Sequence, residues 1–336
     1  MEVAVAAHQV IPVTEPSQVG EARRHAARLA SELGFGEVAA GAAAIVVTEL
    51  ATNLARHARG GRLLFATNDD GAIEVLSLDD GPGMADVAAC LRDGFSTAGT
   101  PGNGLGAIQR LATRFSVFSL PGKGTVIGVQ LAAGTAPPPA PAAYRIGAVS
   151  LAAPGETACG DAWRFRQNGE RAELLVVDGL GHGPVAAEAA DAAVAVFDDM
   201  PGATPSVILE RAHRNLRTTR GAAVAIATLD DRTRQIVFSG AGNIAGRIIS
   251  GVGDRTLLSQ HGTVGFQVRQ LQDISYDWPP HALLVLHSDG IVTRWSPTEA
   301  PGLLQCDPLV IAGWLVREYL RGRDDATVAV VQRIAA

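Results

Sequence analysis

The feature that most constrains this chain of 336 residues is an uncharged, proline-rich segment at residues 134–143. It reads Gly-Thr-Ala-Pro-Pro-Pro-Ala-Pro-Ala-Ala, and its four prolines favour an extended spacer. At about 3.1 Å per residue, such a segment spans roughly 30 Å. The chain has the length of about two domains of roughly 100–200 residues each. We therefore expect one domain over residues 1–133 and a second over residues 144–336, joined by this linker.

The composition predicts two folded domains in a cytoplasmic protein. Hydrophobic residues make up 47% of the chain and charged residues 18%, so each half can bury a core and bulk disorder is excluded. The formal net charge is −6, whereas a nucleic-acid-binding protein usually carries an excess of basic residues. The three cysteines have no metal-ligand spacing, as expected in a reducing compartment. The start carries no basic signal-peptide region, and apolar runs such as residues 42–47 are too short to span a membrane. From the charge we expect no nucleic acid as a partner, and from the short apolar runs we expect no membrane.

Many short strands with a few helices predict an α+β fold in both halves. In the first half, Thr14 is the expected N-cap of the first helix. The elements expected there are a strand at 3–13, helices at 16–33, 37–59 and 105–115, paired strands at 63–68 and 73–78, and a closing hairpin at 116–120 and 125–131. The elements expected in the second half are strands at 145–152, 162–166, 172–177, 222–229, 235–239, 246–250, 283–287 and 326–332, and helices at 184–197, 205–218 and 308–320.

The second of these helices carries Glu49 and Asn53 one turn apart, on one face. An amide oxygen beside a carboxylate suits a Mg²⁺ ion that keeps several waters and binds nucleotide phosphates. The alternative is that both residues are ordinary polar residues on a solvent-exposed face.

Two glycine-containing segments follow. The strand at 73–78 runs into Asp79-Asp80-Gly81-Pro82-Gly83, where a carboxylate could accept a hydrogen bond from a base and the glycines would let the base approach the backbone. Alone, this segment is an ordinary turn. Later, Gly102-Asn103-Gly104-Leu105-Gly106 opens a helix whose N-terminal N–H groups favour phosphate. This segment has neither the strand–glycine loop–helix order of a Rossmann unit nor the Gly-Lys-Ser/Thr ending of a P-loop.

Taken together and in this order, the three segments resemble the Bergerat-type (GHKL) ATP-binding fold, an α/β sandwich, over about residues 10–132. The resemblance implies that Asn53 holds the Mg²⁺ of ATP, that Glu49 acts as general base or orients the nucleophile, and that Asp79 binds adenine. The residues it assigns to the pocket and lid are Gly81, Gly83, Gly102, Gly104 and Gly106, and it implies that Thr125 supports the adenine end. The segment Asp93-Gly94-Phe95-Ser96-Thr97 resembles the small switch serine kinases of the bacterial stressosome (RsbT-like).

The second half places aspartates at the ends of apolar strands. They are Asp161, Asp178, Asp289 and Asp324, each beside glycine or another small or acidic residue. A single Asp-Gly pair is usually a turn, but several converging carboxylates would repel one another unless a hard cation lay between them. Ligands that offer only oxygen select Mg²⁺ or Mn²⁺ over zinc.

This set resembles the SpoIIE-like branch of the metal-dependent phosphatases of the protein phosphatase 2C type, over about residues 144–333. The resemblance implies a β-sandwich flanked by helices. The RsbX-like subgroup of this branch is similar in the segment Asp178-Gly179-Leu180-Gly181-His182-Gly183. The resemblance implies that Asp178 bridges two metal ions, with the Gly179 carbonyl as a further ligand. It assigns Asp289 and Asp324 to the second metal, and Asp161 to direct or water-mediated binding. Two such metals activate a bridging water and clamp the phosphoryl oxygens. His182 could protonate the leaving oxygen, or could serve only the start of a helix.

The two resemblances imply a bacterial partner-switching protein that combines an ATP-dependent serine kinase with a metal-dependent serine/threonine phosphatase. Its substrates would be STAS-domain proteins, either anti-sigma antagonists or stressosome-like proteins, with a sigma factor or another regulator downstream. An alternative is that the first domain binds nucleotide only to regulate a partner or the attached phosphatase. A third is that either half is an inactive scaffold.

Overall fold

The computed structural model describes residues 2–3, 7–92, 104–134 and 143–334. These residues form two compact units, each assembled from separated chain segments. The N-terminal unit comprises residues 8–139 and 296–317, and the C-terminal unit comprises residues 1–7, 140–295 and 318–336. Most of the proline-rich segment, residues 135–142, lies outside the described residues.

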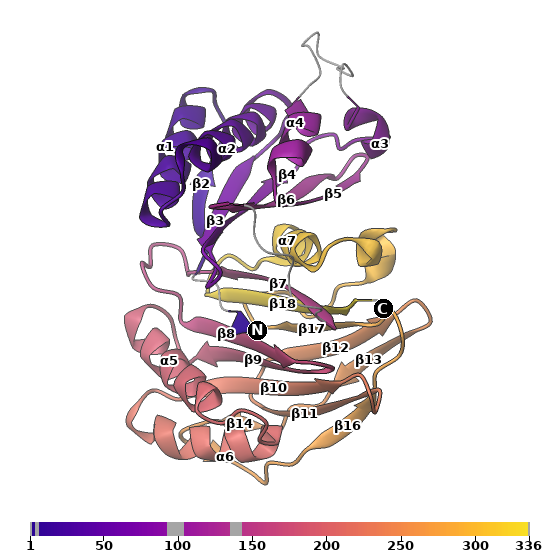
Figure 1. Ribbon diagram of the computed structural model, residues 1–336. Coiled ribbons are helices and arrows are strands. Elements are labelled where there is room, and N and C mark those ends of the chain that lie inside the picture. The colour runs from indigo at the N-terminus through magenta and orange to yellow at the C-terminus, as the bar shows by residue number, and fades with distance from the viewer. Residues whose placement is uncertain (1, 4–6, 93–103, 135–142, 335–336) are drawn as a thin grey trace. The chain divides into compact units, whose positions relative to one another are not determined.

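The N-terminal unit is an antiparallel sheet with helices packed on it (Figure 1). The strand order in the sheet is β2-β3-β4-β6-β5. The elements are β2 (Gln9–Pro12), α1 (Ser17–Glu32), α2 (Glu37–His57), β3 (Arg62–Thr67), β4 (Ala72–Asp79), α3 (Val87–Cys90), α4 (Gly104–Leu111), β5 (Arg114–Leu120), β6 (Gly124–Ala132), the 3₁₀ turns η2 (Pro297–Glu299) and η3 (Leu303–Gln305), and α7 (Pro308–Tyr319).

One face of this sheet carries the main apolar core of the unit. Alanines of α1, among them Ala22 and Ala26, pack with Ala43 and Val47 of α2 over the sheet, and these small side chains let the helices approach closely. Helix α2 is the one helix in the described part of the chain that is long and apolar enough to cross a membrane by length and composition. The buried apolar residues of α2, such as Val46, Val47 and Leu50, contribute to this core, whereas Val38 and Ile45 are exposed.

The start of α1 corrects one expectation. Thr14 does not cap the helix, because Pro16 occupies the N-cap position and provides no side-chain hydrogen bond. The Gln18 side chain turns back and accepts hydrogen bonds from the backbone N–H groups of Thr14, at 2.6 Å, and Glu15, at 3.1 Å. A residue inside the helix therefore satisfies the donors that precede it.

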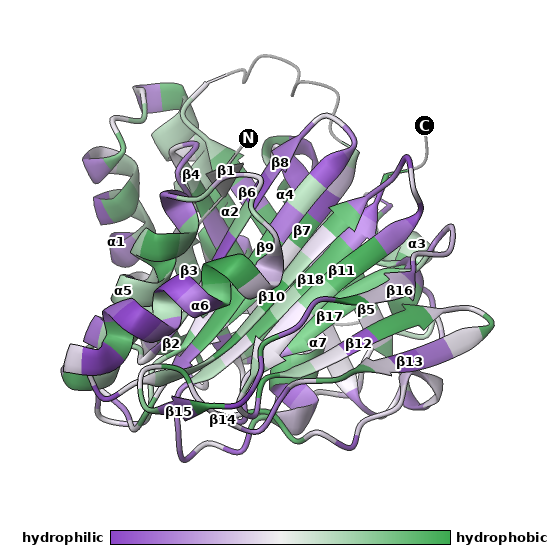
Figure 2. Cartoon of the chain, turned by 90° about the horizontal axis from the view of Figure 1, so that it is seen from below, coloured by the Kyte–Doolittle hydropathy of each residue, from purple (hydrophilic) through white to green (hydrophobic). Residues whose placement is uncertain are grey.

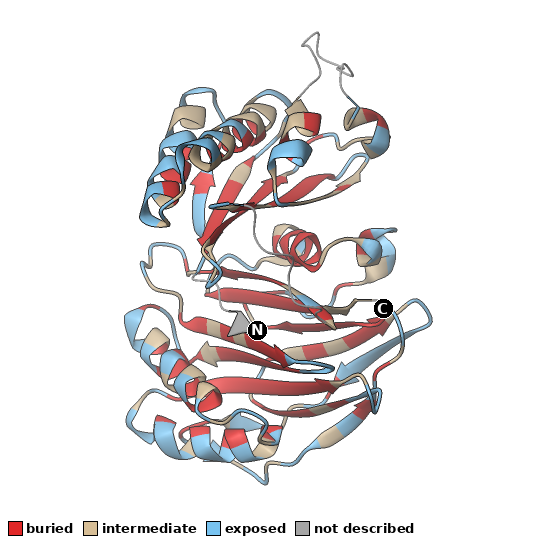
Figure 3. Ribbon diagram, in the orientation of Figure 1, coloured by how far each residue is buried: buried red, intermediate tan, exposed pale blue. Residues whose placement is uncertain are grey.

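The opposite face of the same sheet is covered by α7, which the chain reaches only after residue 295 (Figure 1). A Cβ on Gly313 would lie 3.0 Å from Leu76 and 3.1 Å from Val126, so the helix backbone lies directly against the sheet. The rings of Trp314 and Phe118 meet edge to face at 4.7 Å. Residues 308–316 are all buried, as expected for a helix that is apolar on every side (Figure 3).

The C-terminal unit is a sandwich of two antiparallel sheets, in the orders β1-β8-β9-β10-β11-β16 and β13-β12-β17-β18-β7, with a small β14-β15 hairpin. Its elements are β1 (Glu2–Val3), β7 (Tyr144–Leu151), β8 (Asp161–Asn168), β9 (Arg171–Gly179), α5 (Pro184–Asp198), α6 (Pro205–Asn215), the 3₁₀ turn η1 (Leu216–Thr218), β10 (Ala222–Asp230), β11 (Gln235–Ala241), β12 (Ala245–Ser250), β13 (Gly253–Leu257), β14 (Gly262–Thr263), β15 (Gln267–Val268), β16 (Ile274–Asp277), β17 (Leu283–His287) and β18 (Ala326–Arg333).

Two apolar layers hold this unit together. The inner faces of the two sheets enclose one core, in which Phe165 and Phe238 of one sheet pack with Leu284 of the other. Helices α5 and α6 cover the outer face of the first sheet through residues such as Phe197 and Leu209. Hydrophobic residues accordingly run along the central strands (Figure 2). The α+β class predicted from sequence is confirmed in both units.

The expected strand at residues 3–13 is wrong as a single element. Its first part, β1, pairs with β8 of the C-terminal unit, so that Glu2 lies opposite Arg166. Its second part, β2, pairs with β3 of the N-terminal unit.

Candidate functional site

The first group of polar residues lies where α2 meets α4. Glu49 and Asn53 are half-buried, one turn apart on α2. A Cβ on Gly104, the first residue of α4, would lie 2.7 Å from Glu49 Oε2 and 3.9 Å from Asn53 Oδ1. Helix α4 can begin against these side chains only because Gly104 has none. Gly106, two residues further along α4, is buried, whereas Gly102 and the segment from Asp93 to Thr97 lie outside the described residues.

Asp79 ends β4 and lies opposite Thr125 of β6. Its carboxylate accepts a hydrogen bond from the backbone N–H of Gly81 at 2.7 Å. Burial raises the pKa of the Asp79 carboxyl above its ordinary value, while the Gly81 N–H and the Arg317 guanidinium oppose that shift. Asp79 is therefore a half-buried acceptor at the end of a rigid strand.

The glycine loop after Asp79 is joined to the β5–β6 turn. Gly83 has φ +69°, and a Cβ there would lie 2.2 Å from the carbonyl oxygen of Leu120, so no other residue fits. The Ser119 hydroxyl accepts from Met84 N–H at 2.7 Å and lies 2.9 Å from the Thr125 hydroxyl. The loop, the turn and Thr125 thus form one hydrogen-bonded corner beside Asp79.

Sequence reasoning missed Arg317 of α7 at this corner. Its Nη1 donates to the main-chain oxygens of Asp79 and Lys123, and its guanidinium lies 4.1 Å from the centre of the Trp314 ring. Nothing in the local sequence links residues that lie 238 positions apart. The Lys123 ammonium is exposed and donates to the Glu299 carbonyl at 3.4 Å, so it is a hairpin residue in this structure.

The second group lies at one end of the first sheet of the C-terminal unit. Asp161 and Asp178 are directly opposite each other on β8 and β9, and Asp178 also lies opposite Ala223 of β10. Gly179 follows, and a Cβ there would lie 2.1 Å from the carbonyl oxygen of Ala186 in α5. The strand can end against α5 only with glycine at this position.

The other sheet supplies the remaining carboxylates. Asp161 accepts from the Ser288 hydroxyl at 2.6 Å, just past the end of β17. The next residue, Asp289, accepts from the Asn243 side-chain amide at 2.7 Å. The signal for this contact was the Ser-Asp-Gly motif, because Ser288 directly precedes Asp289. The segment at residues 239–243 also resembles the phosphatase family, but the sequence did not indicate that Asn243 holds Asp289.

Asp324 and Asp325 precede β18. The Asp324 carboxylate accepts from the backbone N–H of Asp325 at 2.9 Å, and Asp325 accepts from the N–H of Ala153 at 2.8 Å. These bonds fix the loop that carries both carboxylates.

The charges of this group act on one another. Burial raises the pKa of Asp178 to about 7, and the carboxylates of Asp289, Asp324 and Asp325 add to that rise. Burial and the Asp178 carboxylate likewise raise the pKa of Asp161 well above its ordinary value, although the Ser288 hydroxyl opposes the shift. Burial and the neighbouring carboxylates therefore make Asp161 and Asp178 harder to ionise.

These donors fit hard divalent cations, because every ligand on offer is oxygen and the mutual repulsion is what a cation removes. Within the described residues, no group of three or more His, Cys, Asp or Glu side chains is placed to hold a metal ion by itself. A cation here would therefore complete its coordination with the Gly179 carbonyl and water, as Mg²⁺ commonly does.

His182 lies near this group but has a partner of its own. Its Nδ1 is 2.6 Å from Glu156 Oε1, and the side chain is exposed, two residues before α5 begins.

The two halves match different known proteins. Residues 13–131 match the family described as histidine kinase-like ATPase domain, and residues 168–333 match the family described as stage II sporulation protein E (SpoIIE). The serine/threonine-protein kinase RsbT of Bacillus subtilis is 36% identical over 109 residues, which cover 32% of this chain and 82% of that protein. The phosphoserine phosphatase RsbX of the same organism is 22% identical over 138 residues, covering 41% of this chain and 69% of RsbX.

Solved structures agree on the fold. A chain from "The bacterial stressosome: a modular system that has been adapted to control secondary messenger signaling" is 32% identical with a TM-score of 0.53, and covers 56% of this chain and 98% of that one. RsbX in complex with magnesium is 20% identical with a TM-score of 0.50, covering 57% of this chain and 96% of that one, and supports the fold alone. The chain therefore belongs to two families at once, with an RsbT-like histidine kinase-like ATPase domain followed by a SpoIIE-like serine/threonine phosphatase domain of the protein phosphatase 2C type.

Proposed function

We propose that the C-terminal unit hydrolyses phosphoserine or phosphothreonine on a protein substrate, with two Mg²⁺ or Mn²⁺ ions held by this chain. The proposed ligands are Asp161, Asp178, the Gly179 carbonyl, Asp289 and Asp324. When bound, such ions supply a nucleophilic water and neutralise charge on the phosphoryl oxygens. The observation that carries the proposal is that Asp161 and Asp178 lie directly opposite each other at a rigid strand end beside Gly179, where burial and then neighbouring carboxylates raise the pKa of Asp178.

The residues of the chain have defined tasks in this proposal. Asp161 and Asp178 are fixed by β-pairing, and the Ser288 hydroxyl orients the Asp161 carboxylate. Asn243 orients Asp289. Asp161 and Asp178 keep their spacing through β-pairing, whereas Asp289 and Asp324 lie on loops held by the hydrogen bonds of Asn243 and of the Asp325 N–H.

The test measures phosphate release from p-nitrophenyl phosphate and from phosphoserine STAS-domain proteins with Mn²⁺ or Mg²⁺. We expect Asp178→Asn to abolish release, and EDTA to do so reversibly. Asp191→Asn, an exposed aspartate on α5, is the matched control and should behave as wild type. Equal activity in wild type and Asp178→Asn would overturn the proposal.

We further propose that the N-terminal unit binds ATP with Mg²⁺ and transfers its terminal phosphate to a serine of a STAS-domain protein. Asn53 would hold the Mg²⁺, Glu49 would orient or deprotonate the acceptor hydroxyl, and Asp79 and Thr125 would bind adenine. The pocket walls would come from Gly81, Gly83, Gly102, Gly104 and Gly106. The close approach of Gly104 to Glu49 and Asn53 supports this, since it brings the N–H groups of a helix start to the two polar side chains.

Transfer from labelled ATP separates this proposal from regulatory nucleotide binding alone. We expect Glu49→Ala to retain ATP binding and lose transfer, and Asn53→Ala to lose both with Mg²⁺. Glu37→Ala, at the exposed start of the same helix, is the control. Nucleotide binding by the wild type without transfer to any STAS-domain protein would instead support a purely regulatory domain.

Both activities would then act in opposite directions on one cytoplasmic partner-switching circuit. The relatives support this, because one carries the name of a serine/threonine kinase and the other that of a phosphoserine phosphatase. Purifying the chain with its native partner and measuring the phosphorylation of that partner tests the circuit, with a sigma factor or another regulator as the output.

A further inference from the structure

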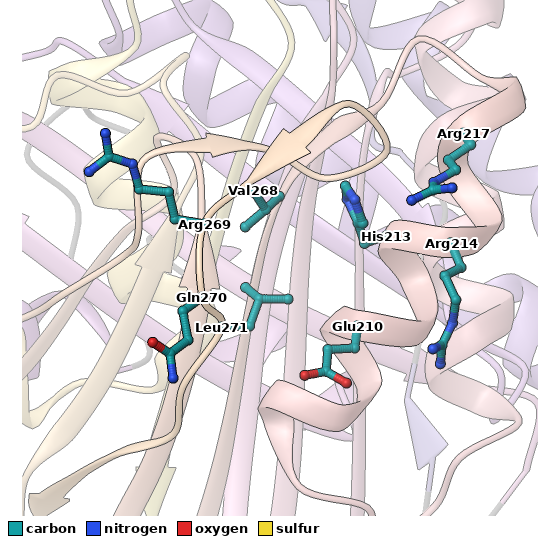
Figure 4. A pocket seen from close by; sticks show the side chains of 8 residues that line it. All are labelled: Glu210, His213, Arg214, Arg217, Val268, Arg269, Gln270 and Leu271. Carbon is teal, nitrogen blue, oxygen red and sulfur yellow. The ribbon is translucent and has the colours of Figure 1, made fainter.

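A surface hollow of about 460 Å³ lies in the C-terminal unit between α6 with η1 and the segment that follows β15 (Figure 4). His213, Val268 and Leu271 lie in its centre, between the two walls. Arg214 and Arg217 stand on the helical side. The middle of the hollow thus holds two apolar side chains beside the His213 ring, and arginines stand at its edges.

Hydrogen bonds join the two segments that form the walls of the hollow. His213 Nδ1 accepts from the backbone N–H of Gly265 at 3.1 Å. At the start of α6, the Asp273 carboxylate accepts from the N–H and the hydroxyl of Ser206, each at 2.8 Å. The hollow is therefore formed before any ligand arrives.

Its charge is unbalanced. Arg214, Arg217 and Arg269 are exposed, and among the described residues they make no hydrogen bond or ion pair. Glu210 is the one acidic residue among those that line the hollow. Some other arginines of this unit do pair with carboxylates, as Arg164 does with Asp198. In a chain of net charge −6, three unpaired guanidinium groups around one hollow favour an anionic ligand.

The hollow also lies at the end of the sheet that carries Asp178. The turn η1 leads through Gly221 into β10, where Ala222 pairs with Gly179. The Gly221 carbonyl accepts from the N–H of Leu180 at 3.0 Å, and the β14–β15 hairpin bonds to Ala222 through Val264. Both walls of the hollow therefore adjoin the residues that flank Asp178.

The surroundings favour a protein ligand over a free inorganic anion. Phe266, in the β14–β15 turn, is 66% exposed and lies beside Gly221. Arginine and aromatic side chains around an apolar centre are the composition of protein interfaces. We propose that this hollow docks an acidic segment of the phosphoprotein substrate, which places the phosphoserine at Asp178. This proposal rests on the phosphatase function proposed above.

The test uses two synthetic phosphoserine peptides of about fifteen residues, roughly 50 Å when extended. One carries glutamates on both sides of the phosphoserine and the other carries glutamines. We expect wild type to show kcat/KM about tenfold higher for the acidic peptide, because each exposed charge pair adds roughly two- to threefold in affinity. The difference should lie in KM and should shrink as salt is raised.

The variant with Arg214→Gln, Arg217→Gln and Arg269→Gln should lose this preference and keep its activity toward p-nitrophenyl phosphate. Arg232→Gln, an exposed arginine in the turn at the opposite end of β10, is the matched control and should keep the preference. Equal kcat/KM of wild type for both peptides overturns the docking proposal, as does a parallel loss of p-nitrophenyl phosphate activity in the triple variant. Failure of wild type to hydrolyse any phosphoester overturns the phosphatase function instead.

Discussion

Arg317 donates a hydrogen bond to the main-chain oxygen of Asp79 from a helix that enters the N-terminal unit late in the chain. The same Nη1 donates to the main-chain oxygen of Lys123, and the guanidinium packs on Trp314. The end of β4 and the β5–β6 turn are thus held together by one side chain. The residue proposed to bind adenine therefore depends for its position on a segment outside the first 133 residues.

We expect Arg317→Ala to lower the free energy of unfolding by about 2–4 kcal/mol, because it leaves two backbone carbonyls without their donor. ATP binding should weaken as the strand end loosens. Urea unfolding and isothermal titration with ATP measure the two effects. Arg23→Ala, at an exposed position of α1, should change neither. Identical results for both variants would mean that Arg317 does not hold this corner.

Gly313 tests the contact between α7 and the sheet. We expect Gly313→Leu to destabilise the chain by roughly 1–3 kcal/mol, because a side chain there would enter space held by Leu76 and Val126. The same substitution at Gly41 of α2, where nothing lies within 4 Å, should stabilise the helix by roughly 0.5–1 kcal/mol. Denaturant unfolding of the two variants gives the comparison, and a shift of the same sign in both would contradict the packing described.

The raised pKa of Asp178 predicts that the stability of the metal-free chain depends on pH. This pKa is about 7 in the folded chain, against about 3.9 when unfolded, so between these values the folded chain holds the additional proton. Stability should therefore fall as pH rises from about 4 to 7 and then level off, by an amount on the order of 4 kcal/mol at most.

Urea unfolding in EDTA across this range measures the slope. Asp178→Asn should reduce the slope, with the raised pKa of Asp161 still contributing to it, whereas Asp191→Asn should retain it, and a slope unchanged by Asp178→Asn would contradict the assignment. Added Mn²⁺ should restore the stability lost at higher pH, since a cation replaces the proton among the carboxylates.

Separating the two halves tests the role of residues 296–317. We expect residues 1–133 alone to bind a hydrophobic dye, because the face of the sheet formed by Leu76, Leu78 and Val126 would lose its cover. A peptide of residues 296–317 should reduce that dye binding, and a scrambled peptide should not. Low dye binding by residues 1–133 alone would show that the sheet does not need α7.

Local patterns were sufficient to predict elements that carry their own signal. Helix α2 was expected at 37–59 and spans Glu37–His57, because its apolar and alanine positions repeat with the helical period until Ala58 turns extended. The strand leading to Asp178 was marked by its continuous apolar run, as expected for a strand buried on both faces. The strands that were missed, such as β13, are short and exposed, so no alternating pattern marks them.

Contacts between distant segments could not be predicted in this way. The sequence showed that 308–320 forms an apolar helix, but not which sheet it covers, since any apolar surface would satisfy it. The arginines around the hollow likewise gave no signal, because Arg217 and Arg269 lie on separate segments that only the fold brings together. The carboxylates around Asp178 were identified because each sits beside its own strand end.

The segment that contains α7 has a consequence for how such a protein can change over evolutionary time. It begins seven residues after Asp289 and ends seven residues before Asp324, two of the proposed metal ligands, yet it belongs to the compact unit of the other domain. Splitting the gene at residues 134–143 would uncover an apolar surface on each product. While the sheet of the N-terminal unit relies on this helix for its cover, the two domains are inherited, expressed and degraded as one chain.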